Sequence, residues 1–489
     1  MITCIDVRTE NQFMMLKSTI TFSRPKPIKK RRSSRKLWVS FTYHKNDNTE
    51  ETDVNQANDS FAERAQNTME NFHCAIGPIL CIAQVFGLFP VSGIRCPSLS
   101  KLQFKRFSFL TVYSACLALM VCFMTVISVI HMLKTFNTDA IQARGGIGAA
   151  TVGAVFYGNS LLASVSFFWL SSRWVPLQYE WRAMEQYVDR NSSETTRLRW
   201  KFYLISFVIL VCSFTEHVLS IFNNVEGYDW HGSNSTFRNF MKIYTLRSHS
   251  FLFDTREIQL YEHEEYLGAT RFNQSHSISV NYNFAFGIYI FVISKIATFT
   301  WNFTDLFIML VATGLAEKYK SLNKRLAVIV TRHQSLLLDQ WAELREKYAT
   351  LSCFVKNVDD HISHIVLLSF ANNLYFICVQ LLNGLSSWEN SLSAVYFFGS
   401  FGFLIGRTCA VTLLTARIYD QSKEALPHLY RCSPSNYCIE VQRLQHQLAT
   451  DEVTLTGLRF FSITRNFMLA VVGAIITYEV LLLQFNDNK

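Results

Sequence analysis

Seven apolar stretches dominate this sequence, and each is long enough to cross a lipid bilayer as a helix. A spanning helix needs roughly 20 mostly apolar residues. The seven stretches are Phe107–Leu133, Gly145–Leu170, Phe202–Phe222, Phe284–Leu315, Ile362–Leu382, Ser391–Ala416 and Ile463–Phe485. Only 17% of the residues are charged, whereas about a quarter are charged in soluble domains. Because a backbone in lipid must satisfy its own hydrogen bonds, the sequence predicts an all-α, multi-pass membrane protein.

The segments outside the spans divide the chain further. Residues 1–70 are polar and aperiodic, with eight Lys or Arg between Arg24 and Lys36. We expect a disordered, basic, cytosolic arm there. Region 71–106 is apolar but contains Pro78 and Pro90, which favours an interfacial or re-entrant helix. We expect the remainder, 107–485, to form one seven-helix transmembrane domain.

The distribution of basic residues in the loops predicts the orientation. Cytosolic loops carry an excess of Lys and Arg. Loops 171–201, 316–361 and 417–462 carry six, eight and five of them, so we expect a cytosolic N-terminus and an extracellular C-terminus. Loops 316–361 and 417–462 are then cytosolic helical extensions. Loop 223–283 is then extracellular, and its glycosylation acceptors are Asn234 and Asn273.

This orientation disfavours a G-protein-coupled receptor, whose N-terminus lies outside the cell. Such a receptor commonly closes its third span with Asp/Glu-Arg-Tyr and carries Asn-Pro-x-x-Tyr in the seventh. Here span three ends in Leu219-Ser220-Ile221-Phe222, and span seven contains no proline. That class remains an alternative only if the topology is reversed.

Three spans carry polar residues along one face. In span four the members are Lys295, Thr298, Asn302 and Asp305. In span three they are Ser213, Glu216, Ser220 and Asn223, with His217 beside them. In span five they are Ser369, Asn373, Gln380 and Asn383. Because polar groups in lipid are costly, the three stripes must meet in a wet or hydrogen-bonded interior. Amides, carboxylates and nearby aromatic rings suit a carbohydrate site or a transporter pathway.

Span seven has a different pattern. Asn466, Gly473, Thr477 and Gln484 fall within about 40° of one another on a helix, in a largely aliphatic background. Such a seam suits a pore lined by one helix from each subunit, or a close contact between helices. Glu479 lies about 140° from the seam, so we expect it to be structural.

Several short motifs resemble one family. The run Thr477-Tyr478 through Gln484-Phe485 is similar to the signature of insect gustatory receptors, and Glu479 resembles their sugar-receptor branch. Further matches are Gln84-Val85-Phe86-Gly87, Trp301–Met309, Asn372–Phe376 and Ile405–Thr408. The resemblance covers roughly residues 72–487, apart from much of loop 223–283, and leaves out the N-terminal arm.

This resemblance implies a sugar-gated, non-selective cation channel of the insect chemoreceptor type, acting in sweet taste at the plasma membrane. It implies a homo- or hetero-tetramer with other gustatory receptors, with a sugar pocket in each subunit and a gate near Gln484 and Phe485. The pocket candidates come from the polar faces in the outer half of the bundle: Glu216, His217, Trp301, Asn302, Asn373, Tyr375 and Gln380. Residues expected to be structural, or to couple binding to gating, are Asp305, Arg407, Tyr478 and Glu479.

Other function classes have less support in the sequence. Clustered Lys and Arg are explained by membrane orientation, so we expect no nucleic-acid partner. No Ser/His/Asp arrangement, phosphate-binding loop or His/Cys cluster indicates an enzyme, a metal or a cofactor. A membrane sugar transporter remains the alternative, although the chain shows no matching halves of the kind that transporters use.

The orientation can be tested with epitope tags. A tag after Lys489 should be stained on intact cells, and a tag before Met1 should be stained only after permeabilisation. The reverse staining pattern would contradict the predicted topology and reinstate the G-protein-coupled class.

Overall fold

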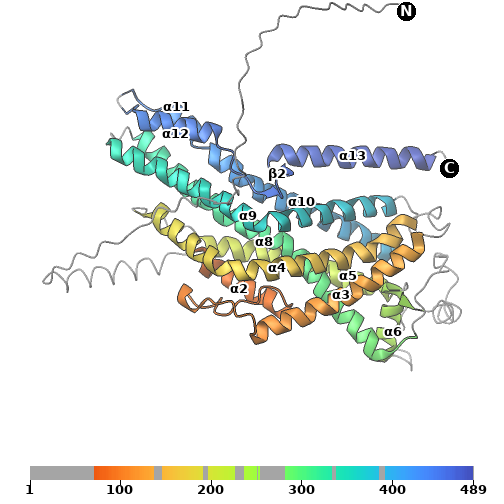
Figure 1. Ribbon diagram of the computed structural model, residues 1–489. Coiled ribbons are helices and arrows are strands. Elements are labelled where there is room, and N and C mark those ends of the chain that lie inside the picture. Colours follow the sequence, from red (N-terminus) through yellow and green to blue (C-terminus); the bar gives the residue numbers. More distant parts are fainter. Residues whose placement is uncertain are drawn as a thin grey trace, which may run out of the picture. The chain divides into compact units, whose positions relative to one another are not determined.

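Six helices of the computed structural model are long and apolar enough to cross a membrane. The structure describes residues 71–136, 146–190, 197–225, 236–249, 252–253, 281–332, 337–384, 391–434 and 436–487. The six helices are α3 (Phe109–Phe136), α4 (Gly146–Asp189), α5 (Leu198–Asn224), α8 (Phe284–Thr331), α9 (Leu338–Gly384) and α10 (Ser391–Lys423). With α13 (Arg465–Asp487) as a further apolar helix, they match the seven predicted spans (Figure 1). The predicted all-α membrane fold is confirmed.

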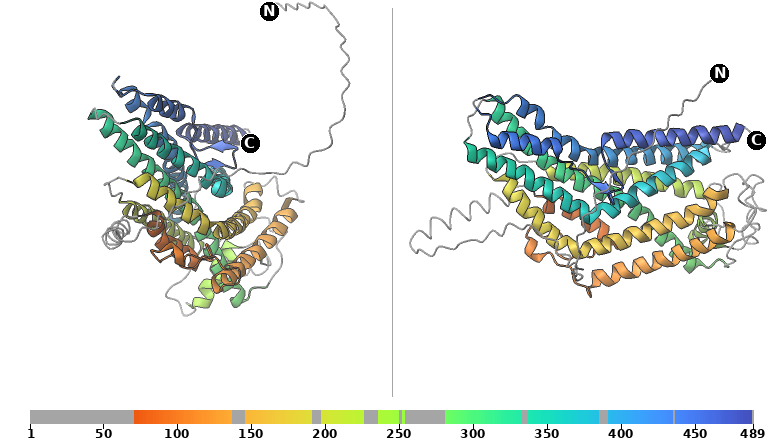
Figure 2. Two further views of the ribbon diagram at one scale, coloured as in Figure 1. Left: turned by 60° about the vertical axis from the view of Figure 1, so that its left-hand side comes forward. Right: turned by 45° about the horizontal axis from the view of Figure 1, so that its top comes forward.

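Several of these helices are much longer than a bilayer core, and α8 and α9 are the longest of the six. Helix α8 has 48 residues and α9 has 47, which corresponds to about 70 Å each at 1.5 Å per residue. The hydrocarbon core is only about 30 Å thick. Each helix therefore joins an apolar part to a polar extension, as the sequence predicted for residues 316–361, and the long helices run side by side (Figure 2).

The segment after α10 is only partly helical. It contains α11 (Leu426–Tyr430), α12 (Ile439–Thr450) and a hairpin of β1 (Thr456–Gly457) and β2 (Phe461–Ser462). Two turn residues, Leu458 and Arg459, have positive φ angles of 49° and 63°, which a helix does not accept. The prediction that helix fills 417–462 is therefore wrong for the hairpin, which α9 holds in place. The Asp359 carboxylate accepts hydrogen bonds from the backbone N–H of Thr456 (2.6 Å) and from its hydroxyl (2.8 Å).

Helix α8 forms the centre of the bundle. It packs against α4, α5, α9 and α10, and every residue from Asn302 to Tyr319 is buried. A helix that is buried all round must satisfy its polar side chains within the protein. Near the extension, Lys201 and Arg417 lie 2.6 Å and 2.9 Å from the Glu317 carboxylate. The next residue, Lys318, lies 2.6 Å from Asp189 and 3.4 Å from Glu185.

Helix α2 (Phe72–Val85) is too short to span a bilayer, since its 14 residues cover about 21 Å. It packs against α4, α5 and α8. The Phe72 ring stacks on Trp181 with centroids 3.6 Å apart, and the Phe72 N–H donates to Glu185 Oε1 at 3.2 Å. A side chain at Gly314 would collide with the Phe72 ring. Helix α2 is thus an integral part of the bundle, and its relation to the membrane surface stays a prediction.

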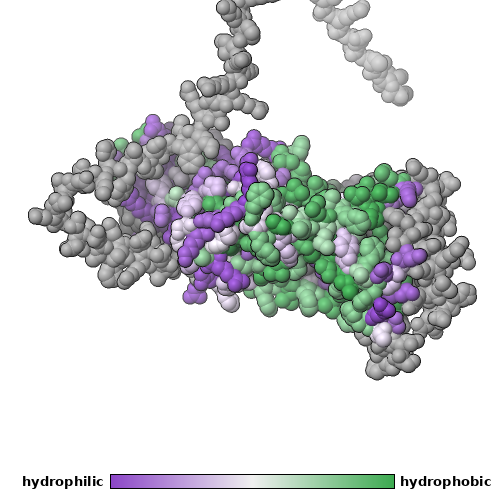
Figure 3. Space-filling view, turned by 60° about the horizontal axis from the view of Figure 1, so that its bottom comes forward, coloured by the Kyte–Doolittle hydropathy of each residue, from purple (hydrophilic) through white to green (hydrophobic). Residues whose placement is uncertain are grey.

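The surface agrees with a membrane setting. A hydrophobic band crosses the face in Figure 3, with hydrophilic atoms on both sides of it. Large apolar side chains are exposed along α3, α4 and α5, including Leu119, Val165 and Phe207. Contiguous exposed apolar surface of this extent marks a lipid-facing or partner-facing region. The predicted multi-pass insertion explains it.

We expect Phe72→Ala to destabilise the fold. Removing a buried aromatic ring costs roughly 3–5 kcal/mol, so the melting temperature of the detergent-solubilised protein should fall clearly. Phe460→Ala is the control, because Phe460 is 79% exposed in the hairpin turn. Equal shifts in both variants would mean that α2 is not part of the stable core.

Candidate functional site

A buried ion pair links α8 to α10 in the middle of the bundle. Arg407 Nε lies 2.8 Å from Asp305 Oδ2, and the two side chains are 2% and 0% exposed. The Asp305 carboxylate also accepts hydrogen bonds from Asn373 Nδ2 at 2.9 Å and from the Ser369 hydroxyl. Burying two charges is costly unless both are paired and hydrogen-bonded. Both of these additional donors, Ser369 and Asn373, belong to α9.

The Arg407 guanidinium also donates hydrogen bonds to two of the predicted pocket residues. It donates to Asn302 Oδ1 and, over 3.2 Å, to Asn373 Oδ1. The same Asn373 oxygen accepts from Trp301 Nε1 at 3.1 Å. The guanidinium also lies over the Trp301 ring, 4.6 Å from its centroid, in a cation–π contact. We call this set, Trp301, Asn302, Asp305, Ser369, Asn373 and Arg407, the inner network.

A second chain of hydrogen bonds joins α9 and α10 to a further helix, α5. Gln380 Nε2 of α9 donates to the Ser400 hydroxyl of α10 at 3.2 Å, and Ser400 donates to Glu216 Oε1 of α5 at 3.1 Å. We call Gln380, Ser400 and Glu216 the outer chain. Glu216 and Gln380 are half-buried, in contrast to the fully buried ion pair. Gln380 Oε1 has no hydrogen-bond partner among the described residues, so the chain retains an unused acceptor.

The remaining two pocket candidates belong to neither set. His217 follows Glu216 on α5 and is half-buried, and its Nε2 has no partner in the described part of the chain. The Tyr375 hydroxyl is hydrogen-bonded to the Thr151 hydroxyl of α4 at 2.6 Å. Five of the seven predicted pocket residues therefore join the two sets, while His217 and Tyr375 border them.

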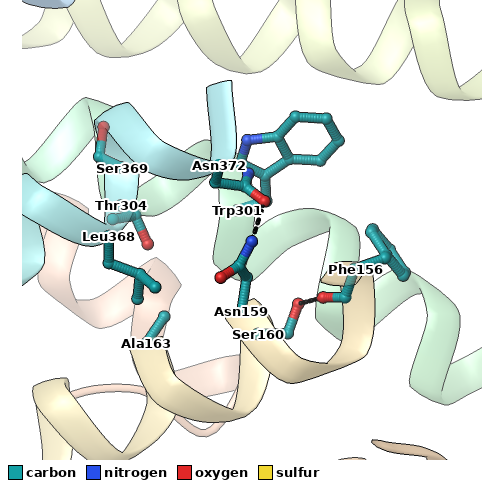
Figure 4. A pocket seen from close by; sticks show the side chains of 9 residues that line it. All are labelled: Phe156, Asn159, Ser160, Ala163, Trp301, Thr304, Leu368, Ser369 and Asn372. Atoms are coloured by element: carbon teal, nitrogen blue, oxygen red, sulfur yellow. Dashed lines mark hydrogen bonds between the residues drawn. The ribbon is translucent and has the colours of Figure 1, made fainter. Parts of the chain in front are cut away.

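A small cavity with both polar and apolar lining residues lies beside the inner network (Figure 4). Its volume is about 10 Å³, close to the space of a single water molecule. It is lined from α4, α8 and α9 by Phe156, Asn159, Ser160, Ala163, Trp301, Thr304, Leu368, Ser369 and Asn372. Figure 4 shows Asn159 of α4 donating to the Asn372 amide oxygen across it. The cavity is far smaller than the roughly 300–1,000 Å³ of typical ligand pockets, so the structure is closed around its polar centre.

Lys295 joins this half of α8 to the short helix α6 (Phe237–Ser248). Its ammonium donates to the Tyr244 hydroxyl at 2.7 Å and lies 4.5 Å from the Phe291 ring centroid. A cation at this depth is expensive without such partners. Helix α6 belongs to the segment that the sequence predicts to be extracellular, while Asn234 and Asn273 of that segment lie outside the described residues.

Helix α13 packs on α9 and α10 and lies along one side of the bundle (Figure 1). The four predicted seam residues, Asn466, Gly473, Thr477 and Gln484, are all exposed on the single chain. A Cβ atom at Gly473 would meet nothing within 4 Å. Tyr478 is half-buried, whereas the side chains of Glu479 and Phe485 lie outside the described set. The seam residues are therefore accessible to water or to a second copy of the chain.

Comparison with known proteins decides the family. A family model described as the trehalose receptor matches residues 54–263 and 254–489. The chain belongs to this family, the sugar branch of the insect gustatory receptors. The resemblance that the sequence motifs indicated is thereby confirmed.

Two relatives of this receptor are from Drosophila melanogaster. Gustatory receptor for sugar taste 64f is 31% identical over 426 residues, which cover 86% of this chain and 82% of the relative. Gustatory receptor 5a for trehalose is 32% identical over 425 residues, with 86% of each chain covered. Since both alignments span most of both chains, the relationship concerns the whole seven-helix domain.

The fold of the receptor is also that of a solved chemoreceptor. The insect olfactory receptor OR5 from Machilis hrabei superposes with a TM-score of 0.58 over 88% of this chain and 100% of that chain. The same receptor in complex with eugenol gives 0.57 over 84% and 97%. The sequences are only 13% identical, so the likeness establishes a shared fold.

Sequence reasoning missed three polar residues of the site. Ser400 connects Gln380 to Glu216, and Thr151 and Asn159 bring α4 into contact with α9. No face pattern distinguishes these residues, because each is a lone polar side chain among small and apolar neighbours. Their partners on other helices reveal them only in three dimensions.

Removing the Asp305 charge should strongly destabilise the receptor. Asp305→Asn leaves the Arg407 charge buried without a counter-ion, and breaking a buried pair costs roughly 3–5 kcal/mol. The melting temperature and the surface expression should both fall, whereas Asp305→Asn with Arg407→Gln should recover part of the loss. Asp360→Asn is the control, because the Asp360–Arg459 pair is exposed and worth at most about 1 kcal/mol. If the double variant is no better than Asp305→Asn, the two charges do not stabilise each other.

Proposed function

We propose that this receptor is a sugar-gated, non-selective cation channel that acts in sweet taste. The observation that carries the proposal is the outer chain itself, in which amide, hydroxyl and carboxylate groups of α9, α10 and α5 are joined by hydrogen bonds. Two of these helices, α9 and α10, also hold the inner network that contains Trp301 of α8. Sugar hydroxyls both donate and accept hydrogen bonds, so they can replace the bonds of the outer chain one for one. An aromatic ring such as Trp301 offers a face to the apolar side of a pyranose. The curated relatives, which are named for sugar taste and for trehalose, support the same ligand class.

The closed cavity indicates how binding would begin. About 10 Å³ cannot hold a monosaccharide, so the sugar must separate side chains that are now bonded to one another. The outer chain is the part that can open at low cost, because Gln380 and Glu216 at its two ends are half-buried and two of its three side chains are neutral. The inner network holds a buried charge pair and is expected to stay intact as the floor of the pocket.

The inner network is proposed to couple the pocket to the pore. It contains Trp301 and Asn302 of α8, Asn373 of α9 and Arg407 of α10, so a shift of one helix alters the bonds of the other two. Leu404 of α10 belongs to a small apolar cluster, and Ile475 of α13 packs against that cluster. A sugar that displaces α10 can therefore move α13 through direct contacts, and a displacement of α8 reaches α13 through α10. Tyr478 and Glu479, on the same helix, keep their proposed structural or coupling role.

The conduction path is proposed to run along α13 of four subunits, in a homotetramer or in a heterotetramer with other gustatory receptors. The support is the exposed seam of Asn466, Gly473, Thr477 and Gln484. Small and polar groups leave room for hydrated ions, and the gate is proposed to lie at Gln484 and Phe485. No metal, cofactor or nucleic acid enters this proposal.

The deciding experiment is expression of the chain in oocytes with a panel of mono- and disaccharides. Rapid sugar-evoked cation current supports the channel. Uptake of labelled sugar without current would favour the transporter alternative, and a current that requires intracellular G-protein signalling would favour the G-protein-coupled class.

Two substitutions test the pocket. Glu216→Gln removes the charge that accepts from Ser400, and Trp301→Ala removes the aromatic face. Loss of one strong contact to a ligand weakens binding by about 1–3 kcal/mol, or roughly 5- to 150-fold. We expect the half-maximal sugar concentration to rise by that factor at normal surface expression. Unchanged values in both variants would locate the pocket elsewhere.

Cysteine substitution tests the pore. A cysteine at Thr477 should react with a charged thiol reagent faster in sugar than without it, and the reaction should block the current. Ile475→Cys is the matched control, because Ile475 is two positions away on the same helix and packs against the bundle. Labelling of position 475 without labelling of position 477 would mean that the seam is only a packing face.

A further inference from the structure

The segment between α2 and α3 is strongly and uniformly basic. No Asp or Glu occurs between Glu70 and Asp139. Over twelve positions the segment presents Arg95, Lys101, Lys105 and Arg106, and all four side chains are exposed. None of the four forms an ion pair with a carboxylate of the described residues. Four unpaired cations on one short loop form a local positive field that attracts anions.

The loop that carries these cations is closed and anchored. Ser92 and Gln103 exchange two backbone hydrogen bonds of 2.9 Å and 3.0 Å, and the 3₁₀ turn η1 (Leu99–Lys101) lies between them. Ile94 and Leu102 are buried in the main core. Gly93 adopts φ +82°, and a Cβ atom there would lie 2.0 Å from the Lys101 carbonyl oxygen. The loop therefore holds its shape before any ligand arrives.

Two contacts from neighbouring helices fix the loop further. His73 of α2 is hydrogen-bonded through Nε2 to the Cys96 carbonyl at 3.0 Å. The Tyr179 hydroxyl of α4 donates to the Leu99 carbonyl at 3.1 Å. With its apolar side chains inside and its carbonyls bound to α2 and α4, the loop directs its cations outward. Fixed charges lose less conformational freedom on binding than mobile ones.

Apolar rings adjoin the cations at the start of a spanning helix. Phe107 is 95% exposed and Phe109 is 83% exposed, and α3 begins at Phe109. Figure 3 shows the side of the bundle on which α2 and α3 lie in Figure 1. On this side, hydrophilic atoms border the apolar band. Basic residues flanked by exposed rings at such a border match the interface of a bilayer, where charged headgroups lie beside acyl chains.

We propose that this loop, defined by Arg95, Lys101, Lys105 and Arg106 with Phe107, binds the headgroups of anionic phospholipids in the cytosolic leaflet. The cytosolic leaflet carries the anionic lipids, and the predicted orientation puts this loop on that side. The cations contact lipid phosphates, and the Phe107 ring enters the acyl region below them. The proposal rests on the loop and its place beside α3, and it does not depend on which molecule opens the channel.

The test uses the full-length receptor, purified in detergent, and an acyl-labelled fluorescent phosphatidylinositol bisphosphate. Binding is followed by fluorescence anisotropy, with the equally labelled phosphatidylcholine as the reference lipid. We expect the anionic probe to bind and the zwitterionic probe to bind at least tenfold more weakly. Replacing all four cations by Gln should weaken binding of the anionic probe by roughly 100- to 1,000-fold, because each basic residue near an anionic surface contributes roughly fivefold.

Two variants with four other cations neutralised serve as matched controls. One replaces Arg31, Arg32, Arg35 and Lys36 of the N-terminal arm. The other replaces the exposed cations Lys320, Lys324, Arg332 and Arg431 of the polar extensions. Both should change the affinity less than threefold. If either control weakens binding as much as the loop variant does, the binding is non-specific or belongs to the arm, and the proposal fails.

Further variants separate recognition from folding. Replacing Arg95 and Arg106 by Lys keeps the charge and should keep the affinity, while Phe107→Ser should weaken it at unchanged melting temperature. If the lysine variant loses binding together with its melting temperature, the loop acts only as structure. Soluble inositol trisphosphate should compete poorly, because it lacks the acyl chains that Phe107 contacts. Full competition at equal concentration would overturn the assignment to membrane lipid.

Discussion

The buried pair of Asp305 and Arg407 constrains the rest of the bundle. A charge in the interior of a membrane protein must be paired and hydrogen-bonded, or the helix that carries it is not stable there. The two residues lie on α8 and α10, and their remaining hydrogen bonds come from Ser369 and Asn373 of α9. Three helices are therefore held in one register by a single cluster, and the aromatic and polar groups around the cluster take their positions from it.

This arrangement explains why α8 can connect distant parts of the receptor. A helix that is buried all round from Asn302 to Tyr319 cannot rotate alone without breaking contacts on every side. At one end of that stretch it contributes to the inner network, and at the other Glu317 and Lys318 pair with cations and carboxylates of α4, α5 and α10. Movements of α8 must then be shared by its neighbours. Such a rigid element transmits a displacement over a long distance.

The helices and the inner residues were predictable from the sequence because their signals are local. Apolar length defines the spans, and the spacing of Asn302 and Asp305 places both on one face of a helix. Partners across helices have no local signal, which is why Ser400, Thr151 and the closed loop after α2 became visible only in the structure. The hairpin at Thr456 was missed for another reason. Its turn depends on positive φ angles at Leu458 and Arg459, two residue types that rarely adopt them.

The contrast between the two polar sets suggests how one bundle can be both stable and responsive. In the inner network, both charges are buried and multiply bonded, so any rearrangement would expose a charge to an apolar environment. In the outer chain, the bonds join a half-buried amide, a hydroxyl and a carboxylate that water or a sugar can satisfy equally well. Exchange there costs little, because one set of hydrogen bonds replaces another. Under the proposed function, a ligand would therefore act on the outer chain, which yields easily, and the inner network, which yields with difficulty, would carry the displacement to α13.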